Sequence, residues 1–509
     1  MNSAESEPIE AVRELLSSAG PLARRAREVL AELTGDPRSL DEIIRRTGVS
    51  RRTVEDFLDA TGEDLERTPT GYRLTDDAAA RYRAEFALDE LGAPPTRTAE
   101  QLGLMAGFIT TGPPPTTALD HVTATPETAL RRAEWMRDNY DLAGAKVLCL
   151  GDHDLTSLAL SIVEPRAQMR VVDLDERILR HIDSAAAERG YDIGSLHADL
   201  RFGLPPELES WADLVFTDPP YTAEGIGLFA ARAAECLAPG NSRLLLAYGY
   251  SPRTPALGHK VQQELLRLGM VFEAILPRFH SYYGAQAIGS TSDLYVCQPT
   301  AHTRKLALRQ ASSIYTHGPQ SVEAVAGSTG QDLLESVSGL LGSSVTELRS
   351  PGWARPVRAS GDPAVFDLRA DPGPWLLRML LACNAERVGF LVDNNHPDIT
   401  NQLAQTDLIE LVSGKFRLRF HRSTPDSKHA VVLAEAVESD SVAAQLLRRA
   451  HGKLGNTWRE GLIARTGELT KREAKQQVAE LAPNPDDLAR RLIDLPRHRA
   501  SEVLARARS

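Results

Sequence analysis

Residues 146–155 read KVLCLGDHDL, an apolar strand that ends in a glycine turn with two acids and leads into a helix. A helical pattern at Leu155–Val163 and a second apolar strand at Met169–Asp173 follow. A strand, a glycine turn and a helix that returns to a parallel strand form the βαβ unit of a doubly wound sheet. Ligands of such sheets bind at the carboxyl ends of the strands, so we examine the strand ends for chemistry.

The alternation of strands and helices continues toward the C-terminus. Further strands are predicted at Ser195–Asp199, Leu214–Thr217 and Arg243–Tyr248, with helices at Glu176–Arg189 and Ile226–Leu237 and a final antiparallel pair at Val271–Leu276 and Asp293–Cys297. Five parallel strands with an antiparallel edge pair predict an α/β fold with a Rossmann-like sheet of the S-adenosylmethionine type over residues 119–300.

Other units flank this predicted sheet. Residues 1–92 are predicted to form a winged-helix domain, with helices at Glu10–Ser18, Leu22–Leu33, Leu40–Thr47 and Arg51–Ala60 before a hairpin around Thr70-Gly71. Residues 93–118 contain five prolines and are predicted to be a linker, after which Thr125 caps a helix. Residues 301–440 are predicted to be a small α/β region, with strands at Arg387–Asn394, Phe416–His421 and Ala430–Ala436, and residues 441–509 a basic helical region. The sequence predicts no role for either.

Composition excludes several classes of protein. The 509 residues are 42% hydrophobic and 25% charged, and no apolar run approaches the roughly 20 residues that a membrane span needs. Four scattered cysteines and an N-terminus without a signal-peptide pattern predict a cytoplasmic protein. Of the net charge of −11, residues 146–224 carry −8, whereas residues 441–509 carry +6. An acidic middle region disfavours tight binding of a nucleic-acid duplex and suits a cationic substrate.

The glycine turn after the first strand is Gly151-Asp152-His153-Asp154. Glycine lets the backbone approach a ligand closely, but two carboxylates would repel the pyrophosphate of a dinucleotide. Asp152 and Asp154 therefore favour a cationic ligand, such as a sulfonium cofactor with an additional ammonium group. The alternative is that Asp154 only caps the following helix.

Acids also end the next two strands. Asp173 follows Gly151 by 22 residues, a spacing typical of an acid that binds ribose hydroxyls. Asp199 ends the third predicted strand, where a carboxylate can accept a hydrogen bond from an adenine amino group. Together these acids predict an adenosine pocket.

The fourth strand gives the most specific motif, Asp218-Pro219-Pro220-Tyr221. Two prolines fix the loop and remove two N–H groups, which leaves carbonyls free to face a donor. A carboxylate, a proline carbonyl and an aromatic ring form a socket for an amino group that acts as a nucleophile. The motif is shared with enzymes that methylate the amino groups of adenine or cytosine, so it predicts transfer to nitrogen.

Together these motifs resemble the branched-chain polyamine synthases, the N(4)-bis(aminopropyl)spermidine synthases. The resemblance covers about residues 10–300 and rests on the segments TPETALRRAEWM, VLCLGDHDLTSLAL, VVDLDERIL, HADLR, ADLVFTDPPYTAEGIGLF and STSDLYV. The family's acidic glycine turn falls on Gly151, Asp152 and Asp154, its ribose acid on Asp173 and its D-P-P-Y motif on Asp218 to Tyr221. This chain carries His153 where the thermophilic enzymes have a third acid.

The resemblance implies aminopropyl transfer from decarboxylated S-adenosylmethionine to a polyamine amine, release of methylthioadenosine, and a homodimer. In this hypothesis Asp218 orients the nucleophilic nitrogen and stabilises the developing ammonium, with Pro219 and Tyr221 completing the cradle. Metal is not needed, because the leaving thioether is neutral. Residues predicted to line the acceptor channel are Asp120, His121, Glu224 and Tyr282.

Two other functional classes stay open at this point. The D-P-P-Y motif, the winged helix and the basic C-terminal region also suit an amino-directed methyltransferase that uses S-adenosylmethionine itself, on nucleic acid or a small amine. A third possibility is a non-catalytic regulator whose winged helix reads DNA while the sheet senses a polyamine or nucleoside.

Overall fold

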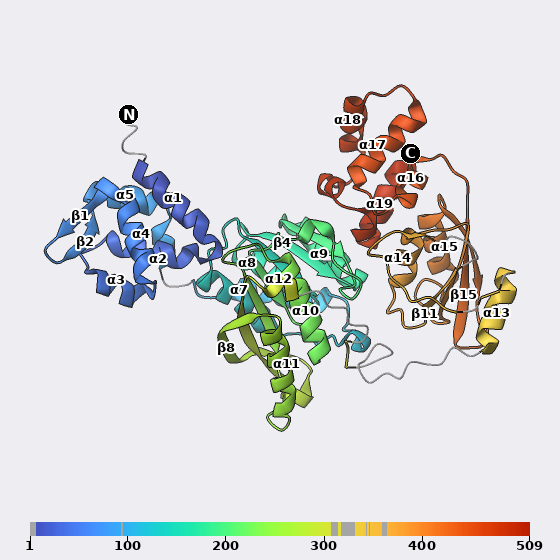
Figure 1. The fold of residues 1–509 in the computed structure, drawn as a ribbon, viewed down its shortest axis with the longest axis horizontal. Helices are drawn as coiled ribbons and strands as arrows, with labels where there is room; N and C mark the ends of the chain where they lie inside the picture. Colours follow the sequence, from blue (N-terminus) through green and yellow to red (C-terminus); the bar gives the residue numbers. More distant parts are fainter. Residues whose placement is uncertain are drawn as a thin grey trace.

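The computed structural model describes residues 7–92, 95–306, 314–316, 331–342, 344–345, 347–358 and 364–508. Figure 1 shows three bodies in a row: an N-terminal helical unit, a central sheet flanked by helices, and a C-terminal unit of sheet and helices. Parts of the predicted 93–118 linker and of the 301–440 region lie outside the described residues. Within the ranges given, no helix has the length and apolar character needed to cross a membrane.

The N-terminal unit has the element order predicted for a winged helix. Ser39 and Ser50 cap the third and fourth helices, because their hydroxyls accept hydrogen bonds from the amides of Glu42 and Thr53. The hairpin follows as an antiparallel pair. The elements are α1 (Glu7–Ala19), α2 (Ala23–Leu33), α3 (Leu40–Thr47), α4 (Arg51–Ala60), β1 (Leu65–Thr68), β2 (Gly71–Leu74) and α5 (Asp76–Glu85).

The segment predicted as a linker contains a helix, α6 (Ala99–Thr111). Thr98 and Gln101 form a capping box at its start, and Met105 and Phe108 are buried against the core under α7 (Pro126–Asn139). The five prolines lie on either side of this helix. The prediction was wrong here because proline content was averaged over the whole segment, which hid a short apolar helix between two proline clusters.

The central sheet has the predicted fold. Its strand order is β5-β4-β3-β6-β7-β9-β8; the pairs from β5 to β7 are parallel, and β9 is antiparallel to both β7 and β8. The order reverses between β3 and β6, and this switch point places a ligand crevice at their carboxyl ends. The strands are β3 (Lys146–Leu150), β4 (Gln168–Asp173), β5 (Ile193–His197), β6 (Leu214–Thr217), β7 (Arg243–Tyr248), β8 (Met270–Ser281) and β9 (Thr291–Pro299). The helices are α8 (Thr156–Val163), α9 (Glu176–Arg189), α10 (Ala223–Cys236), α11 (Pro255–Arg267) and α12 (Thr303–Leu306).

The third strand begins and ends two residues earlier than predicted, so Asp199 lies in the loop after it. Gly194 lies inside the strand, where a Cβ atom would stand 2.7 Å from the guanidinium of Arg490. A glycine in a strand often marks such a close approach, yet its low strand propensity hid the true start of the strand.

The C-terminal unit, residues 331–508, has a second sheet of order β11-β13-β15-β14. Helix α13 packs on one face of this sheet, and α14 to α19 pack on the other. The strands are β10 (Val357–Arg358), β11 (Ala364–Leu368), β12 (Cys383–Asn384), β13 (Arg387–Asp393), β14 (Phe416–His421) and β15 (His429–Ala436), which include the three predicted here. The helices are α13 (Gln331–Leu341), α14 (Trp375–Ala382), α15 (Gln402–Val412), α16 (Val442–Arg448), α17 (Leu454–Thr466), α18 (Lys471–Leu481) and α19 (Arg497–Arg508).

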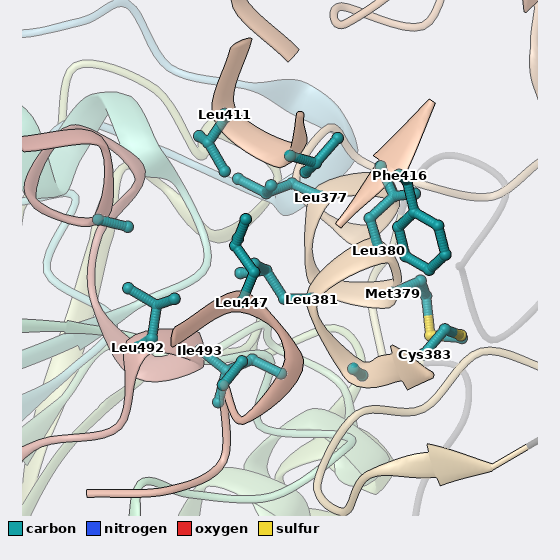
Figure 2. Packing of buried hydrophobic residues seen from close by; sticks show 14 of the residues in the cluster. Leu377, Met379, Leu380, Leu381, Cys383, Leu411, Phe416, Leu447, Leu492 and Ile493 are labelled. Carbon is teal, nitrogen blue, oxygen red and sulfur yellow. The ribbon is translucent and has the colours of Figure 1, made fainter. Parts of the chain in front are cut away.

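The boundary predicted at residue 440 does not separate two cores. Every residue of α14 is buried, and Figure 2 shows its Leu377 and Leu381 among side chains of both the sheet part and the helical tail. A helix that is apolar on all sides needs neighbours all around it. Residues 441–508 therefore complete the core that the preceding sheet begins.

Candidate active site

The strand-end residues gather around one cavity of about 460 Å³ at the carboxyl edge of the central sheet. Six aspartates line it, and among the described residues no lysine or arginine does. The predicted site residues in its lining are Asp120, His121, Gly151, Asp152, Asp154, Asp173, Asp199, Asp218, Pro219, Tyr221 and Tyr282. A cavity of this size matches those that hold cofactor-sized ligands.

Glu224, predicted to contact the acceptor, is not part of this lining. It lies exposed in the first turn of α10, where Thr222 is the N-cap and the buried face of the helix begins at Gly225. Its acidic side chain matches the positive end of the helix dipole. Glu224 was predicted to lie in the site because it follows the D-P-P-Y motif closely in sequence. Its position on α10 instead places it outside the cavity.

Asp152, and not Asp154, caps the helix after the glycine turn. Its carboxylate accepts hydrogen bonds from the amides of Thr156 (2.8 Å) and Ser157 (3.2 Å). Gly151 itself has a φ of +71°, which favours glycine. Burial raises the pKa of Asp152 to about 7, because the hydrogen bonds from Ser157 and Thr156 only partly offset the cost of removing its charge from water.

Asp154 is joined to Asp218 by a buried arginine that the sequence analysis did not single out. Arg132, on α7, donates to Asp154 Oδ2 at 3.0 Å and to Asp218 Oδ2 at 2.7 Å, and its guanidinium stands 4.8 Å from the centre of the Phe216 ring. It has no exposed surface and does not line the cavity, so it holds both carboxylates from behind. The available signal was its position between Ala129 and Met136 on the buried face of α7, since an arginine on a buried face indicates a carboxylate partner.

Asp218 receives three donors and keeps one acceptor position. Besides Arg132, Tyr282 donates to its Oδ2 at 2.7 Å and Tyr221 donates to its Oδ1 at 2.9 Å. A carboxylate has about four lone-pair positions, so among the described residues one remains for a ligand. Burial raises the pKa of Asp218 to about 6, although Arg132 opposes this shift.

A chain of hydrogen bonds leads to Asp218 from its far side. Tyr282 has one hydroxyl proton and gives it to Asp218, so Ser292, at 2.8 Å, must donate to Tyr282. His280 Nδ1, at 2.9 Å from the Ser292 oxygen, must then carry a proton. Because every donor in the chain points toward Asp218, each bond strengthens the next and together they stabilise its ionised form.

The other two predicted strand-end acids, Asp173 and Asp199, differ in how many hydrogen bonds their carboxylates can still accept. Asp173 accepts from the amides of Asp152 (2.8 Å) and Asp175 (2.7 Å), with each oxygen taking one bond. Burial raises its pKa to about 6. Asp199 accepts two bonds at each oxygen, three from Arg201 and one from the indole of Trp375 at 2.9 Å. The adenine contact predicted for Asp199 thus has no lone pair left, whereas Asp173 can still accept ribose hydroxyls.

Two histidines stack against each other in the lining of the cavity. The rings of His121 and His153 are 4.3 Å apart with an angle of 13° between their planes. Burial lowers the pKa of His153 to about 4, and burial together with the neighbouring His153 lowers that of His121 to about 3. Both rings are therefore neutral at pH 7 and add no positive charge to the acidic lining.

Segments beyond residue 300 also reach this cavity. Ile314, Tyr315 and Thr316 line it; the Thr316 amide donates to Asp120 at 2.6 Å and Thr222 donates to the Ile314 carbonyl at 2.7 Å. These residues were not predicted as part of the site, because they belong to no strand end. Among the residues that the structure describes, no group of histidine, cysteine or acidic side chains is arranged to hold a metal ion.

Comparisons with known proteins match the central part of the chain. The model of the branched-chain polyamine synthase A C-terminal domain matches residues 105–317. An uncharacterized protein of Methanocaldococcus jannaschii is 34% identical over 201 residues, which cover 39% of this chain and 50% of that protein. The N(4)-bis(aminopropyl)spermidine synthase of Thermococcus kodakarensis is 35% identical over 175 residues, 33% of this chain and 49% of the relative. The chain thus spans about half the length of the curated relatives it matches.

Among solved structures, the branched-chain polyamine synthase of Thermus thermophilus in complex with N4-aminopropylspermidine and 5'-methylthioadenosine is similar to this chain. Its TM-score is 0.37 and its identity 22%, over 59% of this chain and 93% of the other. The sequence matches agree with the resemblance drawn from the motifs. Residues 105–317 are therefore similar to the C-terminal domain of the branched-chain polyamine synthases.

Proposed function

We propose that this chain transfers an aminopropyl group from decarboxylated S-adenosylmethionine to an amine of a polyamine and releases methylthioadenosine. The observation that carries the proposal is the charge of the cavity, which six aspartates line without a lysine or arginine among the described residues. A polyamine and a decarboxylated sulfonium donor are both cationic, and opposite charges attract strongly at a buried site. The carboxylate of intact S-adenosylmethionine would find no cation in this lining. Three curated relatives of this chain are named N(4)-bis(aminopropyl)spermidine synthase.

In the proposed reaction the lone pair of a neutral amine attacks the methylene carbon next to the sulfonium. The carbon–sulfur bond breaks and its electron pair stays on sulfur, which leaves as a neutral thioether. The neutral amine forms when the substrate ammonium loses a proton to solvent before the attack, and the product nitrogen then carries the positive charge as an ammonium. The free acceptor position of Asp218 can take an N–H from the amine, which orients the lone pair and stabilises the new charge.

The neighbours of Asp218 support this role. Tyr221 acts through its hydroxyl on Asp218, while its ring packs edge-on against Tyr248 at 5.5 Å. The Pro220 carbonyl accepts from the Thr222 amide, so Pro219 is the proline whose carbonyl can meet a substrate N–H. Asp173 has the acceptor capacity to bind ribose hydroxyls of the donor. The homodimer implied by the resemblance stays a prediction.

The test is to incubate the protein with decarboxylated S-adenosylmethionine and spermidine and to follow methylthioadenosine and the aminopropylated product by mass spectrometry. We expect both to form in equal amounts. Asp218→Asn should lower kcat by about 100-fold or more, the usual effect of removing a group that orients a nucleophile and its proton. Asp213→Asn is the matched control, because Asp213 lies at the opposite end of β6 and, among the described residues, its carboxylate accepts a hydrogen bond only from the Lys146 amide, at 2.9 Å.

Calorimetry with the two donors separates this proposal from methyl transfer. Tighter binding of decarboxylated than of intact S-adenosylmethionine agrees with the lining charge. Tighter binding of the intact cofactor, with a methylated acceptor in the product mixture, would replace aminopropyl transfer by the methyltransferase hypothesis.

A further inference from the structure

A side chain of the C-terminal unit forms a hydrogen bond with the wall of the cavity. Trp375, the first residue of α14, donates its indole N–H to Asp199 Oδ2 at 2.9 Å, across 176 residues of chain. The Trp375 residue is 5% exposed and Asp199 is 3% exposed. The bond thus joins two buried groups in different units, one of which lines the cavity.

All four acceptor positions of the Asp199 carboxylate are used by hydrogen bonds within the protein. We therefore assign Asp199 a structural role, which is to fix the loop that contains it. One oxygen accepts from the amide and Nε of Arg201, and the other accepts from Arg201 Nη2 and from Trp375. The same loop supplies Ala198 and Leu200 to the cavity lining. Among the described residues, the indole provides the one hydrogen bond to this carboxylate that does not come from within the loop.

Arg201 extends the connection to a third part of the chain. Its guanidinium stands 5.0 Å from the centre of the Trp375 ring and 5.4 Å from that of Tyr315, which lines the cavity. A guanidinium this close to two aromatic rings attracts both through cation–π interactions. A shift of Trp375 would therefore move the positions of both Asp199 and Tyr315.

Two further interactions fix helix α14 next to Trp375. Asp371 caps it by accepting from the amides of Trp375 (3.0 Å) and Leu376 (2.8 Å). One turn later, on the same face, Arg378 pairs with Glu176 at the start of α9, just after β4. One face of α14 thus contacts the segments that follow both β4 and β5, the two strands that would bind the adenosine part of a ligand.

We propose that Trp375 is a positioning residue for the adenosine end of the pocket, and that binding of an adenosine-containing ligand is coupled to docking of the C-terminal unit. The inference rests on the proposed function only for the identity of that ligand. It gives a role to a region that lies beyond the family match at residues 105–317. Trp375 acts through Asp199 and Arg201, so its loss should weaken donor binding and leave the chemical step unchanged.

The test compares Trp375→Phe with Trp458→Phe by calorimetric titration of methylthioadenosine. Phenylalanine keeps a ring in the core and removes the indole N–H. Trp458 is the matched control, because it is fully buried in the same core and, among the described residues, its Nε1 has no hydrogen-bond partner. We expect Trp375→Phe to raise the Kd about tenfold, the effect of losing a hydrogen bond to a charged acceptor. Trp458→Phe should change it less than about twofold.

Steady-state kinetics separate positioning from a general loss of structure. We expect the KM for the donor to rise with the Kd, while kcat and the KM for spermidine stay within about twofold of wild type. A Trp375→Phe variant with unchanged or tighter methylthioadenosine binding would overturn the inference, and tighter binding would mean that the indole competes with the ligand. If the wild type binds no methylthioadenosine at all, it is the proposed function that fails.

Hydrogen exchange on the wild-type protein tests the coupling without any substitution. Methylthioadenosine should slow exchange in the amides of α14, about 375–382, together with those of the loop at 198–202. Slower exchange in the loop alone, with α14 unaffected, would overturn the coupling even if the Trp375→Phe variant fails to fold.

Discussion

At the scale of single residues, the site depends on how the charges of Asp154 and Asp218 are compensated. Arg132 gives one guanidinium nitrogen to each carboxylate, so two buried acids share one cation. Asp218 nevertheless keeps a pKa near 6, because burial outweighs that attraction. Asp218, which we propose orients the amine, therefore changes its protonation state at a pH of about 6.

The pH dependence of acceptor use follows from this pKa. A free polyamine amine has a pKa near 10, so log kcat/KM for the acceptor should rise with a slope of about one across neutral pH. Below pH of about 6 Asp218 also takes up a proton and loses its acceptor position, so the slope should steepen to about two. A kinetic titration from pH 5 to 9 measures this, and a slope that stays near one down to pH 5 would contradict the role of Asp218.

Replacing Arg132 should destabilise the protein strongly. Arg132→Met keeps the volume but removes the cation that pairs with the buried carboxylate of Asp154 and the 14% exposed carboxylate of Asp218, which should cost roughly 3–5 kcal/mol at pH 8 in urea unfolding. At pH 5 the loss should be smaller, because Asp218 is then mostly protonated. The neighbouring Arg131→Met is the control: Arg131 is exposed and, among the described residues, donates only to the Phe279 carbonyl, so its loss should stay within about 0.5 kcal/mol. Equal losses for the two variants would exclude the bridging role.

At the scale of elements, a helix start marked by a capping residue was predicted correctly, whereas a strand start that depends on a long-range contact was not. The predicted cap at Thr125 begins a helix as expected, because capping is a local interaction between a hydroxyl and an amide three residues later. Helix α6 also begins with such a cap, at Thr98, but the surrounding prolines hid it. The start of β5 was misplaced because Gly194 serves a contact with Arg490, about 300 residues further along the chain.

The cap of α6 gives a test at this scale. Thr98→Ala removes the hydroxyl that accepts from the Gln101 amide at 3.1 Å and should destabilise the helix by about 1 kcal/mol. Amide hydrogen exchange in α6 should then accelerate about fivefold, with the central sheet unchanged. Thr96→Ala, two residues earlier at an exposed position, is the control and should leave the exchange of α6 as it is.

At the scale of the whole molecule, the uneven charge of the sequence has an internal explanation. Arginines of the basic tail pair with acids of the central unit: Arg490 with Glu207 at 3.2 Å and Arg499 with Asp183 at 3.8 Å. His498 also contacts Asp183, at 2.8 Å. Part of the positive charge of the tail thus faces the acidic middle of the same chain.

Docking of the C-terminal unit should depend on Glu176. This carboxylate pairs with Arg378 and accepts from the Arg497 amide at 2.7 Å. Glu176→Gln leaves the buried Arg378 without its counter-ion and should weaken docking by roughly 1–3 kcal/mol, which differential scanning calorimetry would detect as an earlier unfolding transition of the C-terminal unit. Glu188→Gln on the same helix is the control, because its side chain is 76% exposed. An unchanged calorimetric trace for Glu176→Gln would contradict this docking role.

The sequence by itself determined the sheet, its strand ends and the acids gathered there. This was possible because a parallel α/β topology brings the carboxyl ends of its strands to one edge, so local patterns are enough to place Gly151, Asp173 and Asp218 around one cavity. Only the tertiary structure placed Arg132 against Asp218 and Trp375 against Asp199, turned Glu224 away, and joined the basic tail to the acidic middle. These contacts link residues 86 and 176 positions apart, and no local period or motif carries information over such distances.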